Sequence, residues 1–290
     1  MAVVEVTSAP SGLYLRAALG LLPARRPSAL GDTALVRRQV AVERDHLARY
    51  DRVCGFGLTD TLPPTYPHVL AFPLAMRLMS AADFPVPVVG VVHVANRITV
   101  LRDIDAGEVL DVRVGCENLR PHRRGRQFDV VASVSSGGET VWRGVSTYLS
   151  RARAAAPATE RPPATADERE SPAPNGAGVP AAPTARWTVP ADIGIRYAQV
   201  SGDRNPIHTS RIGARLFGFP RPIAHGMWSK ARALAALTGR LPDRYTVDVT
   251  FKQPVRLPST IGFTAAEGAT GWEFRLDGDK PHLAGVVTPP

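Results

Sequence analysis

The stretch YAQVSGDRNPIHTSRIGA at residues 197–214 decides how the rest of the chain is interpreted. Within a few positions it holds a carboxylate at Asp203, an amide at Asn205 and an imidazole at His208. Gly202 precedes this group and leaves the backbone free to turn. Pro206 lies within the group and fixes its own φ at about −65°. We therefore expect a tight turn rather than a regular helix or strand. Such a turn can direct a carboxylate and an imidazole at one point, as acid–base chemistry requires.

A second segment, AHGM at residues 224–227, is followed by an alanine-rich apolar run to Leu237. This pattern predicts a turn that opens a buried helix. The first N–H groups of a helix have no partners within the helix, so they can stabilise developing negative charge. The backbone N–H of Gly226 is the candidate donor for that purpose.

Together the two segments resemble the hydratase 2 motif of the MaoC-like hot-dog family. This family includes (R)-specific enoyl-CoA hydratases and (R)-3-hydroxyacyl-thioester dehydratases. Its pattern is an aromatic residue, then small-Gly-Asp-x-Asn-Pro-aliphatic-His and a later small residue, followed by a proline-aliphatic-x-His-Gly-Met segment. The matching residues are Tyr197, Ser201, Gly202, Asp203, Asn205, Pro206, Ile207, His208 and Ala214, then Pro222, Ile223, Ala224, His225, Gly226 and Met227.

The resemblance implies a chemistry. Hydration of a trans-2-enoyl thioester requires deprotonation of the water that attacks C3, a proton at C2 and stabilisation of the thioester oxygen. The family's catalytic dyad falls on Asp203 and His208: His208 takes the proton of the water, while Asp203 holds the same water and exchanges the C2 proton. The oxyanion donor falls on Gly226. Dehydration uses the same groups in reverse, and neither a metal nor a redox cofactor is expected.

Three further residues of the motif have supporting or open roles. Asn205 either positions the substrate or stabilises the turn through its amide. His225 is expected to orient the loop by hydrogen bonds. Ser201 occupies the small-residue position of the motif.

The chain also repeats itself at a shift of 147 residues. Six of the fourteen positions from 42 to 55 are identical to their counterparts from 189 to 202, where ordinary composition gives about one. Each copy continues with a glycine turn, an apolar helix at 71–81 or 226–238, and strand patterns rich in β-branched residues. The strands are expected at 88–101, 108–118, 127–135 and 140–149, and at 245–252, 259–266, 272–276 and 282–288.

Two such copies resemble a double hot-dog, an α+β fold with two antiparallel sheets, each wrapped around a central helix. Residues 1–150 are assigned to the N-terminal half and residues 186–290 to the C-terminal half. Between them, 19 of the 35 residues of 151–185 are Ala or Pro, which predicts a linker without a core. The two halves would form an internal pseudo-dimer, and a homodimer of the whole chain stays open.

The two copies differ at the positions that carry the chemistry. Phe56 and Thr61 stand where the second copy has its acid and its base, and Phe72 corresponds to His225. The first half is therefore expected to be non-catalytic. Its apolar groove along 71–82 is expected to house the acyl chain of the substrate.

Composition and cysteine spacing argue against a membrane-spanning, secreted, disulfide-rich or zinc-binding protein. Apolar residues make up 44% of the chain, enough for buried cores, and the formal net charge is +9. No apolar run is long enough for a membrane span, and the first residues do not form a secretion signal. The two cysteines, Cys54 and Cys116, lack the spacing of a disulfide framework or zinc site. A cytoplasmic location is the expectation.

The positive charge suits a phosphate-bearing carrier, namely the nucleotide of coenzyme A or the acidic surface of acyl carrier protein. A nucleic-acid partner is not expected, because no basic stretch alternates with aromatic residues. The densest basic run, HRRGR at residues 122–126, is interpreted as an exposed hairpin tip.

Two alternatives to a dehydratase remain at this point. The first is an acyl-thioesterase, because hot-dog folds also host that chemistry. Its carboxylate usually lies on or near the central helix, and residues 227–240 contain no Asp or Glu. The second is a non-catalytic subunit that binds acyl thioesters, which the presence of both Asp203 and His208 disfavours. Chain length, carrier and physiological direction stay open.

Overall fold

The computed structural model describes residues 2–7, 26–151, 182–269 and 271–290. The elements of the first half are β1 (Ala2–Glu5), β2 (Thr33–Ala41), α2 (Arg44–Cys54), α3 (Tyr66–Met79), β3 (Val91–Val100), β4 (Val109–His122), β5 (Gly125–Ser136) and β6 (Glu139–Arg151). Those of the second half are β7 (Ala185–Val189), α4 (Ile193–Ser201), α5 (Pro206–Thr209), α6 (Arg211–Leu216), α7 (Gly226–Ala235), β8 (Tyr245–Phe251), β9 (Ser259–Gly268), β10 (Gly271–Asp277) and β11 (Pro281–Thr288).

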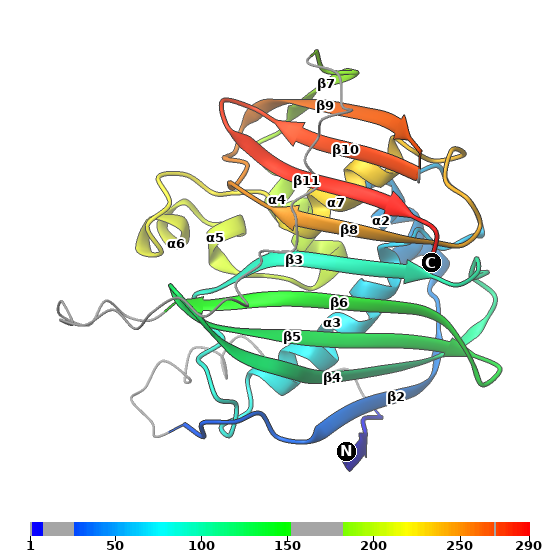
Figure 1. Cartoon of the computed structure of the whole chain (residues 1–290), viewed down its shortest axis with the longest axis vertical. Coiled ribbons are helices and arrows are strands. Elements are labelled where there is room, and N and C mark those ends of the chain that lie inside the picture. The colour runs from blue at the N-terminus through cyan, green and yellow to red at the C-terminus, as the bar shows by residue number, and fades with distance from the viewer. Residues whose placement is uncertain (1, 8–25, 152–181, 270) are drawn as a thin grey trace.

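The strands form one 11-stranded sheet in the order β1-β2-β4-β5-β6-β3-β8-β11-β10-β9-β7. Apart from the parallel pair β1–β2, its neighbours are antiparallel. From β2 to β7 the strand order is symmetric about the β3–β8 pair: each of these strands in the first half has a counterpart at the same distance from this pair in the second half. The sequence repeat therefore corresponds to a structural repeat. The two expected sheets are continuous, because β3 and β8 join them edge to edge (Figure 1).

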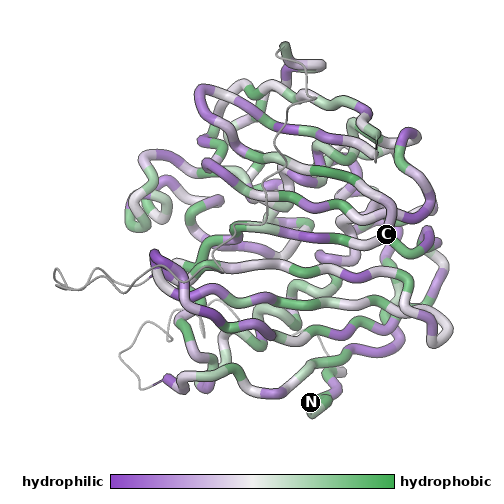
Figure 2. Tube along the Cα trace, viewed as in Figure 1, coloured by the Kyte–Doolittle hydropathy of each residue, from purple (hydrophilic) through white to green (hydrophobic). Residues whose placement is uncertain are grey.

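Each half of the sheet curves around its own long helix. In β4, Leu110, Val112 and Val114 are fully buried and their neighbours are more exposed, the period-two pattern of a strand with one buried face. The tube in Figure 2 shows the corresponding change between apolar and polar residues along the strands. The helix α3 contacts β4 and β5, and α7 contacts β10. Both helices lie behind the sheet in Figure 1.

The expected elements are present, with one clear difference. Helix α3 begins at Tyr66 rather than at 71, because Pro67 occupies its first turn, where a proline removes no helical hydrogen bond. Ala75 on this helix is buried in the core. The predicted linker 151–185 lies mostly outside the described residues, and its end residues belong to β6 and β7. Among the described residues, no helix is long and apolar enough to span a membrane.

A buried lysine joins the two halves beneath the sheet seam. Lys230 on α7 is fully buried, and its Nζ donates to the backbone oxygen of Asn96 at 3.0 Å, to Asn96 Oδ1 at 2.7 Å and to the backbone oxygen of Val247 at 3.1 Å. Asn96 lies on β3 and Val247 on β8. Burial lowers the pKa of Lys230 well below its usual range, yet three acceptors match the three N–H groups of an ammonium. The lysine is therefore a polar link between the halves.

We expect Lys230→Met to destabilise the fold by about 2–4 kcal/mol, because it leaves buried oxygens on both central strands without a donor. Urea unfolding measures the loss. The matched control is Lys252→Met at an exposed position, where a change within about 0.5 kcal/mol is expected. Equal effects of the two substitutions would contradict a linking role for Lys230.

Candidate functional site

The Asp203–His208 segment begins in a turn between short helices. Helix α4 ends with Gly202 at φ 75°, a left-handed conformation that favours glycine. A turn without helix was expected through His208. The turn instead ends at Asn205, and His208 lies on the short helix α5, which α6 follows directly. Asn205 caps α5: its Oδ1 accepts a hydrogen bond from the backbone N–H of Ile207 at 3.3 Å. The structure thus uses the Asn205 amide to hold the turn.

Two glycines allow these helices to pack closely. A Cβ at Gly194 on α4 would lie 2.1 Å from the backbone oxygen of His208, and a Cβ at Gly213 on α6 would lie 2.4 Å from Pro206 Cβ. Helix α5 is therefore held between α4 and α6, which fixes the direction of His208. Sequence analysis did not single out either glycine, although a glycine inside a helical pattern often marks such a close approach.

His208 is buried, and the hydrogen bond of its ring to Ile223 determines its tautomer. Its Nδ1 lies 2.8 Å from the backbone oxygen of Ile223, and because a carbonyl can only accept, Nδ1 carries the proton. In the neutral ring Nε2 is then unprotonated and can act as a base. Burial lowers the pKa of His208, while Asp203 and the Ile223 carbonyl oppose that shift. The neutral, basic form is favoured near neutral pH.

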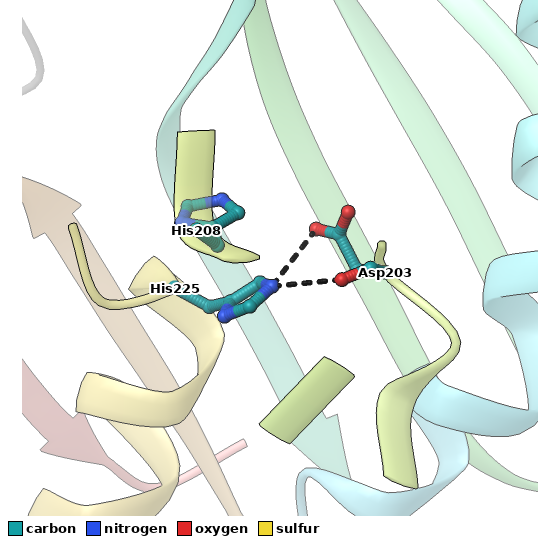
Figure 3. Close-up of side chains that lie close together, drawn as sticks. All are labelled: Asp203, His208 and His225. Carbon is teal, nitrogen blue, oxygen red and sulfur yellow. Dashed lines mark hydrogen bonds and ion pairs between the residues drawn. The ribbon is translucent and has the colours of Figure 1, made fainter. Parts of the chain in front are cut away.

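His225 connects the two segments of the motif. Its Nε2 donates to the backbone oxygen of Asp203 at 2.9 Å and lies 3.8 Å from Asp203 Oδ2 (Figure 3). Its ring stacks on His208 with centroids 3.7 Å apart. Burial, followed by the effect of His208, lowers the pKa of His225 to about 3, so this ring stays neutral. The loop-orienting role expected from the sequence matches these contacts.

The carboxylate of Asp203 is partly accessible, with 28% of its side chain exposed. Its Oδ1 accepts from the backbone N–H of Asn205 at 3.2 Å, and its own N–H donates to Ser201 Oγ at 3.2 Å. One oxygen of Asp203, one ring nitrogen of His208 and one ring nitrogen of His225 lie within 4.8 Å of one another. A single water or hydroxyl could bridge groups at this spacing.

The same three residues have a spacing that could hold a metal ion. Two of their nitrogens are already engaged, because His208 Nδ1 faces the Ile223 carbonyl and His225 Nε2 faces the Asp203 carbonyl. An ion next to the Asp203 carboxylate would have to displace the proton on His225 Nε2 and its hydrogen bond. The donor set therefore fits proton transfer better than metal binding.

Gly226 is the first residue of α7, so its N–H has no acceptor within the helix. A Cβ at this position would lie 3.0 Å from Phe251 Cε1. A side chain at position 226 would therefore press against the Phe251 ring, which favours glycine here.

One side chain of the first half borders the catalytic turn. Phe72 on α3 places its Cδ1 3.8 Å from the position that a Cβ would take at Gly202. Phe56 stacks on Tyr50 with ring centroids 6.5 Å apart, and Thr61 forms an isolated β-bridge with Asp105. The three positions expected to be non-catalytic therefore supply no acid or base, but Phe72 helps to enclose the site.

Two histidines of the first half were missed by sequence analysis. The ring of His93 on β3 lies 4.6 Å from Tyr148 and 5.0 Å from Phe251, and 6.2 Å from His68 on α3, between centroids. Burial lowers the pKa of His68 to about 4 and of His93 to about 3, and Asp203 opposes both shifts. They are thus neutral groups within electrostatic range of Asp203. Contacts between distant segments place them there, and no local spacing signals it.

A model of the MaoC like domain family matches residues 173–276, which contain both segments of the site. The chain is 40% identical over 284 residues to 3-hydroxyacyl-thioester dehydratase X of Mycobacterium tuberculosis, covering 96% of this chain and 98% of that protein. It is also 37% identical over 71 residues to 3-hydroxybutyryl-CoA dehydratase of Methylorubrum extorquens, covering 23% of this chain and 45% of that protein.

Solved structures agree with the fold. The crystal structure of HtdX of Mycobacterium tuberculosis superposes with a TM-score of 0.76 at 36% identity, covering 89% of this chain and all 100% of that one. Another protein of that organism, described as a double hotdog fold, gives a TM-score of 0.52 at 14% identity and covers 90% of this chain and 96% of its own. The expected double hot-dog fold is confirmed.

The buried histidines make stability depend on pH. The ordinary pKa of 6.5 falls to about 3 for His225 in the folded protein, so the unfolded chain binds the proton first as pH falls. Stability is therefore lost on acidification below 6.5. We expect His225→Phe to remove about 2 kcal/mol of the stability change between about pH 7 and about pH 5.

Urea unfolding of both proteins at the two pH values measures this difference. Asp51, whose pKa burial raises to about 6, has the opposite effect, since its stability contribution is lost as pH rises through that value. Asp51 is present in both wild type and His225→Phe, so its effect cancels in the difference between their pH dependences. The control is His122→Gln at the β4–β5 turn. The same pH dependence in wild type and His225→Phe would show that His225 is not held neutral.

Proposed function

This chain belongs to the MaoC-like dehydratase family, and we propose that it is a hydro-lyase acting on 3-hydroxyacyl thioesters in fatty-acid metabolism. It dehydrates (R)-3-hydroxyacyl thioesters and, in reverse, hydrates trans-2-enoyl thioesters. The observation that carries the proposal is the convergence of Asp203, His208 and His225 within 4.8 Å, inside the fold shared with named dehydratases.

In hydration, the water lies between Asp203 and His208. His208 Nε2 accepts a proton as the water oxygen bonds to C3, since its Nδ1 proton is committed to Ile223. Negative charge then develops on the thioester oxygen, where the Gly226 N–H at the start of α7 stabilises it. Asp203 holds the water and relays to C2 the proton that His208 took from it, so that both side chains return to their starting states. Dehydration reverses each step: C2 loses a proton and the C3–O bond breaks as the leaving oxygen is protonated.

The same proposal assigns different roles to the two halves. The C-terminal half, 186–290, supplies the chemistry, the N-terminal half, 1–150, houses the acyl chain, and 151–185 links them. Phe72 beside Gly202 supports this assignment, because an acyl chain leaving the turn meets α3 there. Both Phe72 and Ala75 are buried in the core, so the chain is expected to meet α3 on the side of Phe72 that borders Gly202.

The substrate is an acyl thioester, with no nucleic acid and no metal or redox cofactor required. We place the protein in the cytoplasm. Its two free cysteines, Cys54 buried and Cys116 partly buried, suit a reducing compartment.

The two alternatives are less well supported. A thioesterase would need a carboxylate on or near the central helix, and α7 (Gly226–Ala235) contains no Asp or Glu. A non-catalytic binding subunit would not need an unprotonated imidazole nitrogen close to a carboxylate. The relatives reported above by name are dehydratases.

We expect Asp203→Asn and His208→Gln each to lower kcat for crotonyl-CoA hydration by about 10²–10⁴-fold, because each removes one acid–base group. Loss of enoyl absorbance measures hydration, and release of free thiol in the same samples measures thioesterase activity. The control is His122→Gln, far from the motif in sequence. Near-wild-type kcat in folded variants would show that the dyad is wrong, and rapid thiol release would favour the thioesterase.

The hydration product is expected to be the (R)-3-hydroxyacyl thioester, as in the hydratase 2 enzymes that the motif resembles. Chiral chromatography of the acid released from the product identifies the enantiomer. A product that is mainly (S) would contradict this assignment while leaving the hydration itself intact.

A further inference from the structure

Helix α6 carries an unusual exposed surface. Of the eight large hydrophobic side chains exposed in the described part of the chain, three belong to this helix and its end: Ile212 at 74%, Leu216 at 79% and Phe217 at 40%. Single exposed apolar residues are common, but a cluster this close together marks an interaction site. Figure 1 shows α5 and α6 projecting beside the sheet.

Arginines flank these apolar side chains. Arg211, Arg215 and Arg221 are exposed and form no ion pair with any of the described residues. The sequence from 204 to 242 contains no Asp or Glu at all. The surface is therefore apolar at its centre and positive around it, and its charge is not balanced locally.

This surface is attached directly to the catalytic turn. Gly213 packs against Pro206, the residue that opens α5, and Ala214 is fully buried behind the exposed side chains. His208 lies on α5, one short helix away. A partner bound to α6 would thus stand beside the residues that act on the thioester.

We propose that the α6 surface, formed by Arg211, Ile212, Arg215, Leu216 and Phe217, docks an acidic carrier protein that presents the acyl thioester on a phosphopantetheine arm. The inference rests on the proposed function and names the carrier. Acidic side chains of the partner pair with the arginines, and its apolar residues cover Ile212 and Leu216. Free coenzyme A offers no apolar surface that could cover Ile212 and Leu216, so the carrier protein is the occupant that fits.

A second copy of the chain fits the surface less well. In a two-fold contact the same patch faces itself, so the arginines would oppose each other. An acidic partner avoids this repulsion and also accounts for the absence of acidic residues around the patch.

The experiment compares one acyl group on two carriers. (R)-3-Hydroxybutyryl is supplied on a bacterial acyl carrier protein and on coenzyme A, and kcat/KM for dehydration is measured with each. We expect Arg211→Glu combined with Arg215→Glu to lower kcat/KM for the protein-bound substrate by about tenfold or more, through KM, and to change it for the coenzyme A thioester by less than about threefold. Leu216→Ser should act in the same direction.

The matched control is Arg123→Glu combined with Arg124→Glu, which makes the same charge change at the exposed β4–β5 turn. It should leave both substrates unaffected. Equal losses for both carriers, or an equal effect of the control pair, would overturn the docking surface. So would sedimentation showing a wild-type dimer that Leu216→Ser converts to a monomer, because a second copy would then cover α6.

Failure of the proposed function has a different outcome. If wild type dehydrates neither thioester, the proposed dehydratase activity is wrong. Binding of the carrier protein to the α6 surface is then measured by fluorescence anisotropy of labelled carrier protein. Binding that weakens in the Arg211→Glu, Arg215→Glu variant would uphold the surface. Absence of binding to wild type would overturn it.

Discussion

The antiparallel pairing of β3 with β8 is the contact on which the rest of the structure depends. It aligns Ala95 with Thr250 and Val100 with Tyr245, and so joins two curved sheets into one. Lys230 reinforces this seam from below, because its three donors reach both strands. Helix α2 adds a second contact between the halves, because it packs against α4 and α7.

In the proposed mechanism one half supplies the chemistry, while residues of both halves lie close to it. The proposed acid, base and backbone donor all come from the second half. Phe72, His68 and His93 reach the same region from the first half, where burial keeps both imidazoles neutral. Asp203 thus lies within electrostatic range of two neutral imidazoles from the half that lacks the motif.

Much of this arrangement could be predicted because it is local. The glycine turn before Asp203, the helix after His225 and the alternating strands follow from short-range backbone preferences and periodicity. The beginning of α3 was placed too late, because Pro67 in its first turn was not used as a helix signal. The pairing of β3 with β8, the burial of Lys230 and the position of His93 arise from contacts between distant segments. No periodicity or spacing in a single sequence encodes them.

The central claim is that Asp203 and His208 act on C3 and C2 of a thioester whose carbonyl is held at the start of α7. The most direct measurement is a crystal structure of the Asp203→Asn variant with (R)-3-hydroxybutyryl-CoA bound. We predict that the C3 hydroxyl lies within hydrogen-bond distance of His208 Nε2 and of the side chain at position 203, with the thioester oxygen on the Gly226 N–H. A thioester bound elsewhere, or a C3 hydroxyl directed away from His208, would contradict the account.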